Sequence, residues 1–114
     1  MGDQRLVTRV SIDQICSKKA VVTTDMNPSG KVDILIESDC ENVKSLAGNL
    51  KEISIKDSYM PFGDNPVFIL AGKNNLTPTC LVPTAIVNAV WIEAGLIARS
   101  FALNAKELKI LFEE

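Results

Sequence analysis

The chain has 114 residues, of which 46% are hydrophobic and 23% charged, and its formal net charge is −2. This size and balance predict a single globular domain over residues 1–114 with a substantial apolar core. Lysines and arginines are scattered, and the aromatic residues are four Phe, one Trp and one Tyr. These features argue against nucleic acid as a partner, because such a partner requires a basic patch or a stacking platform.

Targeting and membrane signals are not recognisable in the sequence. No apolar signal segment follows the first charged residues, and Leu6 stands where a myristoylation signal has Ser or Thr. An odd number of cysteines without a secretory signal indicates a reducing cytoplasm. The apolar stretch Thr79–Ala98 approaches membrane-span length, but Thr84, Asn88 and Glu93 interrupt it. We therefore predict a cytoplasmic protein in which this stretch is a core helix, with no membrane partner.

Alternating apolar residues predict three strands in the first third of the chain. We expect them over Leu6–Ile12, Lys19–Met26 and Lys31–Glu37. The turn signal at residues 27–30, Asn-Pro-Ser-Gly, predicts that the second and third strands form a hairpin. A polar connection over residues 13–18 joins the first two strands and carries Cys16.

Two shorter helices are predicted before the central one. Ser38 and Glu41 have the spacing of a capping box, which predicts a helix to about Leu50 with Cys40 in its first turn. A short extended piece is expected around residues 53–55, followed by a loop over residues 57–63. Asn65 and Pro66 then have the pattern of an N-cap and a first-turn proline, which predicts a helix over residues 66–73.

The longest apolar stretch predicts a central helix over Pro83–Arg99. It is apolar nearly all round, so neighbouring elements or a partner must cover most of its sides. Glu93 is the exception, because helical phase places this carboxylate among apolar residues. Two interpretations remain open for Glu93. Its side chain reaches the edge of the helices or a subunit interface, or it is a buried functional acid that needs a partner.

The last residues alternate again, with Leu108, Ile110 and Phe112 on one side, which predicts a final strand over residues 108–113. The predicted fold is therefore α+β. It has a small, mostly antiparallel sheet of three N-terminal strands and one C-terminal strand, with about three helices packed on one face.

Each cysteine lies at a junction between predicted elements. Cys16 precedes a strand, Cys40 follows one, and Cys80 lies just before the central helix. Thiolates brought to one edge of a sheet are natural ligands for zinc or an iron–sulfur cluster, and Asp39 is a candidate fourth ligand. The alternative is that the cysteines are small buried hydrophobic residues. The spacing contains no Cys-x-x-Cys motif, and the chain has no histidine.

Two segments resemble the TSCPD domain family. Ile15-Cys16-Ser17-Lys18, followed by a hairpin and by Ser38-Asp39-Cys40-Glu41-Asn42-Val43, is similar to the first half of that domain. Pro78-Thr79-Cys80-Leu81-Val82-Pro83-Thr84-Ala85-Ile86 resembles the Thr-Ser-Cys-Pro-Asp-Ala-Leu element that gives the family its name. The order of elements is also similar to that of iron–sulfur cluster scaffold proteins. The resemblance implies metal binding through Cys16, Cys40 and Cys80.

Three functional hypotheses follow from the sequence. The first is a metal- or cluster-binding protein. The second is an interaction protein, most simply a homodimer, whose apolar surface includes Trp91 and the loop Tyr59-Met60-Pro61-Phe62. The third is a thiol enzyme with Cys40 or Cys80 as nucleophile, which ranks last because the chain has no histidine to act as its base.

Overall fold

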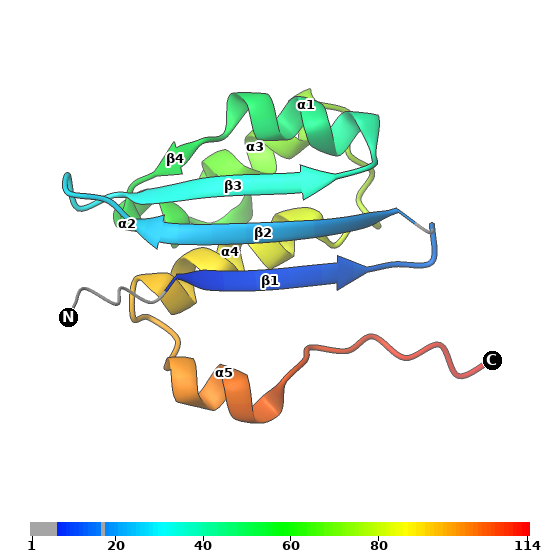
Figure 1. Cartoon of the computed structure of the whole chain (residues 1–114). Coiled ribbons are helices and arrows are strands. Elements are labelled where there is room, and N and C mark those ends of the chain that lie inside the picture. Colours follow the sequence, from blue (N-terminus) through cyan, green and yellow to red (C-terminus); the bar gives the residue numbers. More distant parts are fainter. Residues whose placement is uncertain (1–6, 17) are drawn as a thin grey trace.

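The computed structural model describes residues 7–16 and 18–114. One antiparallel sheet has the strand order β1-β2-β3-β4 (Figure 1). Its strands are β1 (Thr8–Asp13), β2 (Lys19–Met26), β3 (Val32–Ser38) and the short β4 (Glu52–Ile53). The helices are α1 (Glu41–Asn49), α2 (Ile55–Ser58), α3 (Pro66–Lys73), α4 (Val82–Glu93) and α5 (Arg99–Ala105), and a 3-10 turn, η1, covers Phe62–Asp64. The predicted α+β fold is confirmed.

The first three strands follow their sequence pattern closely. β2 has the predicted bounds and β3 lies one residue later than predicted, while Leu6 lies outside the described residues. β2 and β3 pair from Met26↔Val32 to Ala20↔Ser38, so the predicted hairpin is confirmed. Alternation succeeds here because one face of each strand is buried and the other is exposed to water.

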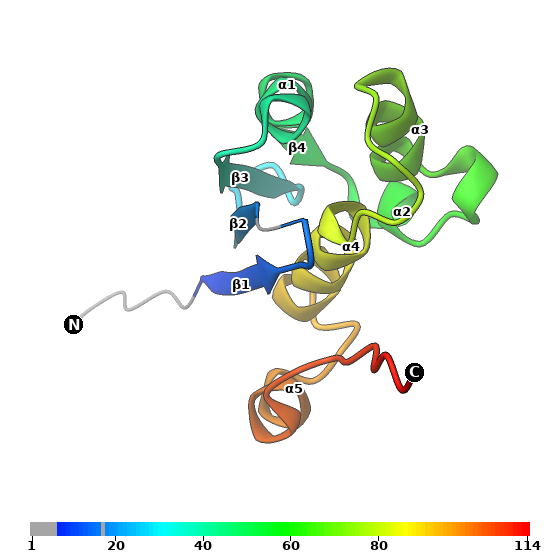
Figure 2. The ribbon, with the colours of Figure 1, turned by 90° about the vertical axis from the view of Figure 1, so that its right-hand side faces the viewer.

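The core lies between the inner face of this sheet and helices α1 to α4. Figure 2 shows α2, α3 and α4 on one side of the sheet. The fully buried residues at this junction include Val22, Val32, Val43, Leu46, Val67, Ile86 and Val90. A buried hydrogen bond, 2.9 Å from Thr24 Oγ1 to the Ala89 carbonyl, also fixes α4 against β2. Apolar burial and this bond together hold α4 against the sheet.

Helix α1 begins differently from the prediction. Its N-cap is Cys40, which makes no side-chain capping bond, so the predicted capping box is wrong. Ser38 Oγ accepts from the Cys40 N–H at 3.1 Å and donates to the Lys19 carbonyl at 2.7 Å. Glu41 Oε2 lies 3.4 Å from Lys44 Nζ instead of reaching back to residue 38. The hydroxyl of Ser38 is thus used to join β3 to β2 and to form a tight local turn.

The central helix is shorter than predicted, and more helix follows it. Gly95 has φ +81°, and the N–H groups of Leu96 and Ile97 donate back to the Trp91 carbonyl, which ends α4 in a glycine cap. The chain then starts α5 at Arg99, a helix that the sequence analysis missed. Helix α2 and the η1 turn also occupy much of the region expected as extended chain and loop over residues 53–63.

The predicted final strand is wrong. Residues 106–114 contain no regular element, and no strand lies beside them among the described residues. α5 ends at Ala105, and the chain leaves the helix at its C-cap Lys106, whose φ is +70°. Alternation of apolar residues favours a strand only where a neighbouring strand supplies the hydrogen bonds.

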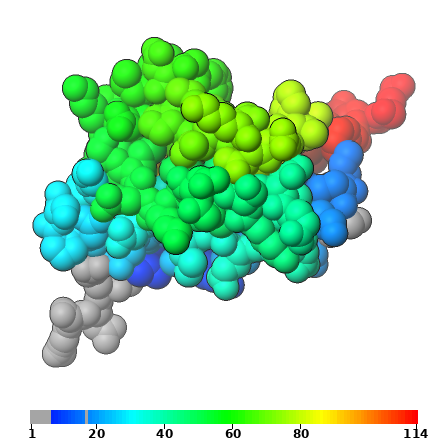
Figure 3. Space-filling model, turned by 90° about the horizontal axis from the view of Figure 1, so that it is seen from above, coloured from blue at the N-terminus to red at the C-terminus, as the bar shows by residue number. Residues whose placement is uncertain are grey.

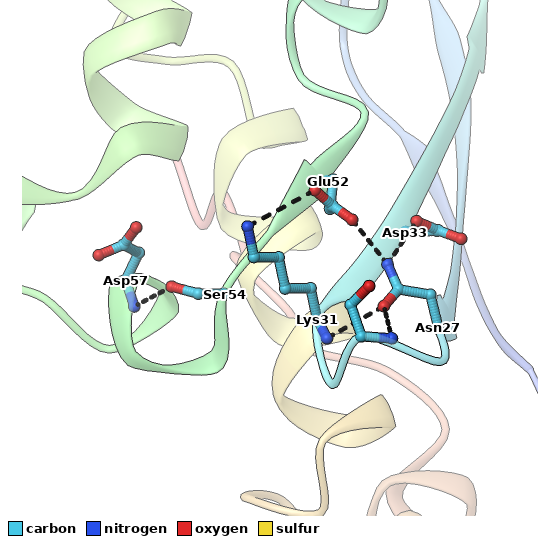
Figure 4. Close-up of polar contacts among 7 residues, drawn as sticks. Asn27, Lys31, Asp33, Glu52, Ser54 and Asp57 are labelled. Carbon is cyan, nitrogen blue, oxygen red and sulfur yellow. Dashed lines mark hydrogen bonds and ion pairs between the residues drawn. The ribbon is translucent and has the colours of Figure 1, made fainter.

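The turn between β2 and β3 is closed by one amide side chain (Figure 4). Asn27 Oδ1 accepts from the Ser29 and Lys31 N–H groups at 2.9 and 3.2 Å. Its Nδ2 donates to Asp33 at 2.9 Å and to Glu52 at 2.7 Å. Asn27 therefore offsets the repulsion between the carboxylates of Asp33 and Glu52 and links the turn to β4.

None of the helices in the described part of the chain combines the length and the apolar composition needed to cross a bilayer.

Asn65 is the buried polar residue that joins α3 to α2. Its Oδ1 accepts from the Val67 N–H at 3.0 Å, and its Nδ2 donates to the Ser58 and Met60 carbonyls at 3.1 Å each. We predict that Asn65→Ala lowers the free energy of unfolding by about 2 kcal/mol, because a helix cap and two buried bonds are lost. Urea unfolding measures this. The exposed Asn104→Ala is the control, and equal midpoints for the two variants would contradict the prediction.

Candidate functional site

The segments that carry the three cysteines lie at one end of the sheet. The β1–β2 turn, the junction from β3 to α1 and the loop before α4 are all at the right of Figure 1. Side-chain bonds connect these segments. Gln14 Oε1 accepts from the Leu81 N–H at 2.8 Å, and Asn42 Nδ2 donates to the Asn75 carbonyl at 3.3 Å. The three segments therefore lie at the same end of the sheet.

The cysteine side chains themselves have different surroundings. Cys16 is exposed, whereas Cys40 and Cys80 are half-buried and pack against the apolar core. Cys80 Sγ accepts a weak hydrogen bond from Gln14 Nε2 at 3.7 Å. Asp39 is exposed, at the rim of a shallow depression of about 350 Å³ on the sheet. Two of the three thiols thus have the surroundings of small hydrophobic residues.

No group of three or more Cys, His, Asp or Glu side chains lies close enough to hold a metal ion within residues 7–16 and 18–114. A metal held by Cys16, Cys40, Cys80 and Asp39 therefore remains a prediction from sequence.

Glu93 is a buried charged residue with three hydrogen-bond donors around its carboxylate. Its side chain is only 5% exposed. Its carboxylate accepts from Thr8 Oγ1 at 2.9 Å on β1 and from the Met26 N–H at 3.0 Å on β2. Arg99 Nη2 donates to the same carboxylate at 3.2 Å. Three donors from three segments satisfy this buried charge. Glu93 therefore does not reach the edge of the helices, as the first of its two interpretations expected, but is buried with the partner that a buried carboxylate needs.

Arg99 also contacts the free edge of the sheet. Its Nη1 donates to the Val7 carbonyl at 3.2 Å, just before β1 begins. The sequence analysis did not identify this pair, but a signal was present. Glu93 and Arg99 are the only charged residues between Lys73 and Lys106, so each is the nearest partner available to the other. The ion pair fixes the direction in which the chain leaves α4.

Beyond this ion pair the chain presents a set of exposed apolar side chains that we call the C-terminal apolar surface. Its members, each 65–77% exposed, are Phe101, Leu103, Leu108, Ile110, Leu111 and Phe112. α5 contributes no buried residue. Figure 3 shows the last residues, in red, protruding from the body of the molecule. Monomeric proteins rarely leave so many consecutive large apolar side chains in water.

The central helix, by contrast, is well covered within the chain. Thr84 is the one fully exposed residue of α4. Trp91 is half-buried, and its Nε1 donates to the Ser58 carbonyl of α2 at 3.0 Å. A small hollow of about 180 Å³ is lined by Val87, Asn88, Trp91 and Ile97. Of the predicted apolar surface, Tyr59 and Phe62 of the loop are exposed whereas Trp91 is half-buried, and further exposed apolar side chains lie on α5 and the segment after it.

Comparison with known proteins identifies a family. A family model described as Family of unknown function (DUF6951) matches residues 8–105, from the start of β1 to the end of α5. No curated protein and no solved structure matches the chain. The match gives no support to the resemblance to the TSCPD domain or to iron–sulfur scaffolds.

Removing the Glu93 carboxylate tests its structural role. We predict that Glu93→Ala lowers the free energy of unfolding by about 3 kcal/mol, because the Met26 N–H and the Arg99 guanidinium lose their buried acceptor. Glu41→Ala is the control, because its exposed pair with Lys44 contributes little. Chemical denaturation measures both variants, and a Glu93→Ala loss no larger than that of the control would contradict this role.

Proposed function

We propose that this chain, which belongs to the family of unknown function DUF6951, is an interaction protein that binds a protein partner through its C-terminal apolar surface. The observation that carries this proposal is the exposure of Phe101, Leu103, Ile110 and Phe112 beside a well-packed core. Burying such side chains is favourable by roughly 1.5–3 kcal/mol each, so a protein that covers them gains substantial free energy.

The surroundings of the cysteines and of Glu93 support the same proposal. Cys40 and Cys80 are half-buried against the core, and the Glu93 carboxylate accepts hydrogen bonds from three structural donors. The strongest unexplained feature of the molecule is therefore an apolar surface, and apolar surface is used to bind proteins.

A thiolate metal site is the second candidate. The common edge occupied by the Cys16, Cys40 and Cys80 segments favours it (Figure 1). Zinc or an iron–sulfur cluster would need the exposed Cys16 turn to move toward the other two thiols, with Asp39 or a partner residue completing the site.

A photocrosslinking residue tests the interaction. We expect benzoylphenylalanine in place of Phe101 to give adducts with an identified protein when cells are irradiated. Phe62 is the matched control, because it is the same residue type with nearly the same exposure, 75% against 73%, on η1. Adducts at Phe62 and none at Phe101 would indicate that the partner binds the loop before α3 instead of the C-terminal apolar surface. An absence of adducts at both positions would contradict an interaction function.

Metal analysis tests the second candidate. If the thiolates bind metal, protein purified without oxygen and chelator contains stoichiometric zinc, or iron with sulfide, and Cys40→Ser loses it. Ser45→Ala is a suitable control, because Ser45 is also on α1 but is not a ligand in the proposal. Metal-free wild-type protein after reconstitution would eliminate this candidate.

A further inference from the structure

We infer that the partner is a second copy of this chain, and that residues 109–113 of each copy add as an antiparallel strand to the free edge of β1 of the other. This inference rests on the proposed interaction function and names its partner. Four observations carry it: the open edge of β1, the charge pattern of two segments, the direction of the chain, and an apolar flank of α4.

The first observation is the open edge. β1 pairs with β2 on one side and with nothing on the other among the described residues. The Val7 carbonyl is bound by Arg99 Nη1 and therefore points away from β2. Backbone groups alternate in direction along a strand, so those of Arg9, Ser11 and Asp13 point to the same open side. An edge with unpaired N–H and C=O groups is a template for a further strand.

The second observation is charge complementarity. In an antiparallel pair with Ser11 opposite Leu111, Asp13 lies opposite Lys109 and Arg9 lies opposite Glu113. Both facing pairs have opposite charges, which stabilises cross-strand neighbours. Arg9 and Asp13 have no salt-bridge partner in the described structure, and Lys109 makes only an exposed pair with Glu107 at 3.4 Å. If the two segments ran parallel, these opposite charges would no longer face each other.

The same register matches the apolar residues. Ile110 then lies opposite Ile12, and Phe112 lies opposite Val10, on the inner face of the sheet. Ile12 is buried and Val10 is half-buried against the core. By helical phase, Ile92 is on a different flank of α4 from Trp91, and it is only half-buried. An added strand therefore places its apolar side chains over an incompletely covered flank.

The direction of the chain selects a second copy over the molecule's own edge. In Figure 1, β1 and the chain from α5 to the C-terminus both run from left to right. The segment would therefore meet its own β1 in a parallel arrangement. A two-fold axis perpendicular to β1 reverses the partner's strand and gives the antiparallel pairing. The exchange is reciprocal, as isologous dimers require.

Two charge reversals test the pairing. We expect sedimentation of the wild-type protein between micromolar and millimolar concentrations to show a dimer that dissociates on dilution. Asp13→Lys and Lys109→Glu each put like charges opposite each other twice per dimer. Each variant alone should raise the dimer dissociation constant by about 10- to 100-fold. The matched controls are Asp64→Lys and Lys73→Glu. They make the same two changes of charge at exposed positions outside the proposed strand pair.

Mixing the two single variants is the decisive step. In the mixed dimer each lysine again faces a carboxylate, so Asp13→Lys and Lys109→Glu chains should form a heterodimer with near wild-type affinity. Thermal melting of each variant checks that it is folded. A wild-type protein that stays monomeric, or a dimer insensitive to both reversals, overturns the inference. So does a mixture that fails to pair, which would indicate docking of the segment on its own chain. A monomer that still crosslinks another protein at Phe101 would leave the proposed function intact.

Discussion

Glu93 carries a negative charge into the junction of β1, β2 and α4, where protein donors must replace water. The carboxylate accepts hydrogen bonds from three donors, which are Thr8, the Met26 N–H and Arg99, and each donor comes from a different segment. The carboxylate therefore holds the end of the central helix against the sheet and recruits Arg99 from the following segment. Because Arg99 also binds the Val7 carbonyl, the chain after α4 is directed along the open edge of β1. The exposed position of α5 and of the residues after it follows from this arrangement.

The fold thus separates two kinds of apolar residue. Those of the sheet and of α1 to α4 are buried together in one core, and the half-buried thiols of Cys40 and Cys80 are part of its boundary. Those from Phe101 to Phe112 remain in water in the single chain. A free strand edge and an exposed alternating segment are both aggregation hazards when separate. If the segment of one copy pairs with the strand edge of another, both hazards are removed. The same pairing then explains why the chain has an open edge and an exposed apolar segment.

Local signals in the sequence predicted local structure well. The bounds of β2 and α3 follow from alternation and from the Asn65 cap, because the partners of these residues lie nearby in the chain. The end of α4 was missed because the conformation of Gly95 outweighed an apolar pattern that continues past it. For Glu93 the sequence left two interpretations open, since two of its three donors, Thr8 and the Met26 N–H, lie far away in sequence. The alternation after Leu108 identifies strand-forming residues, but a sequence cannot show which edge, or which copy, completes the strand.

The most direct test of this account is amide hydrogen exchange at Arg9, Ser11 and Asp13, measured by NMR at several protein concentrations. These N–H groups face the open edge of β1, whereas neighbouring Val10 faces β2 and serves as an internal reference. In the dimer these three amides should be protected at high concentration together with those of Lys109, Leu111 and Glu113, which face them in the proposed register, and all should exchange rapidly on dilution. Rapid exchange at every concentration, or protection that dilution does not change, would contradict it.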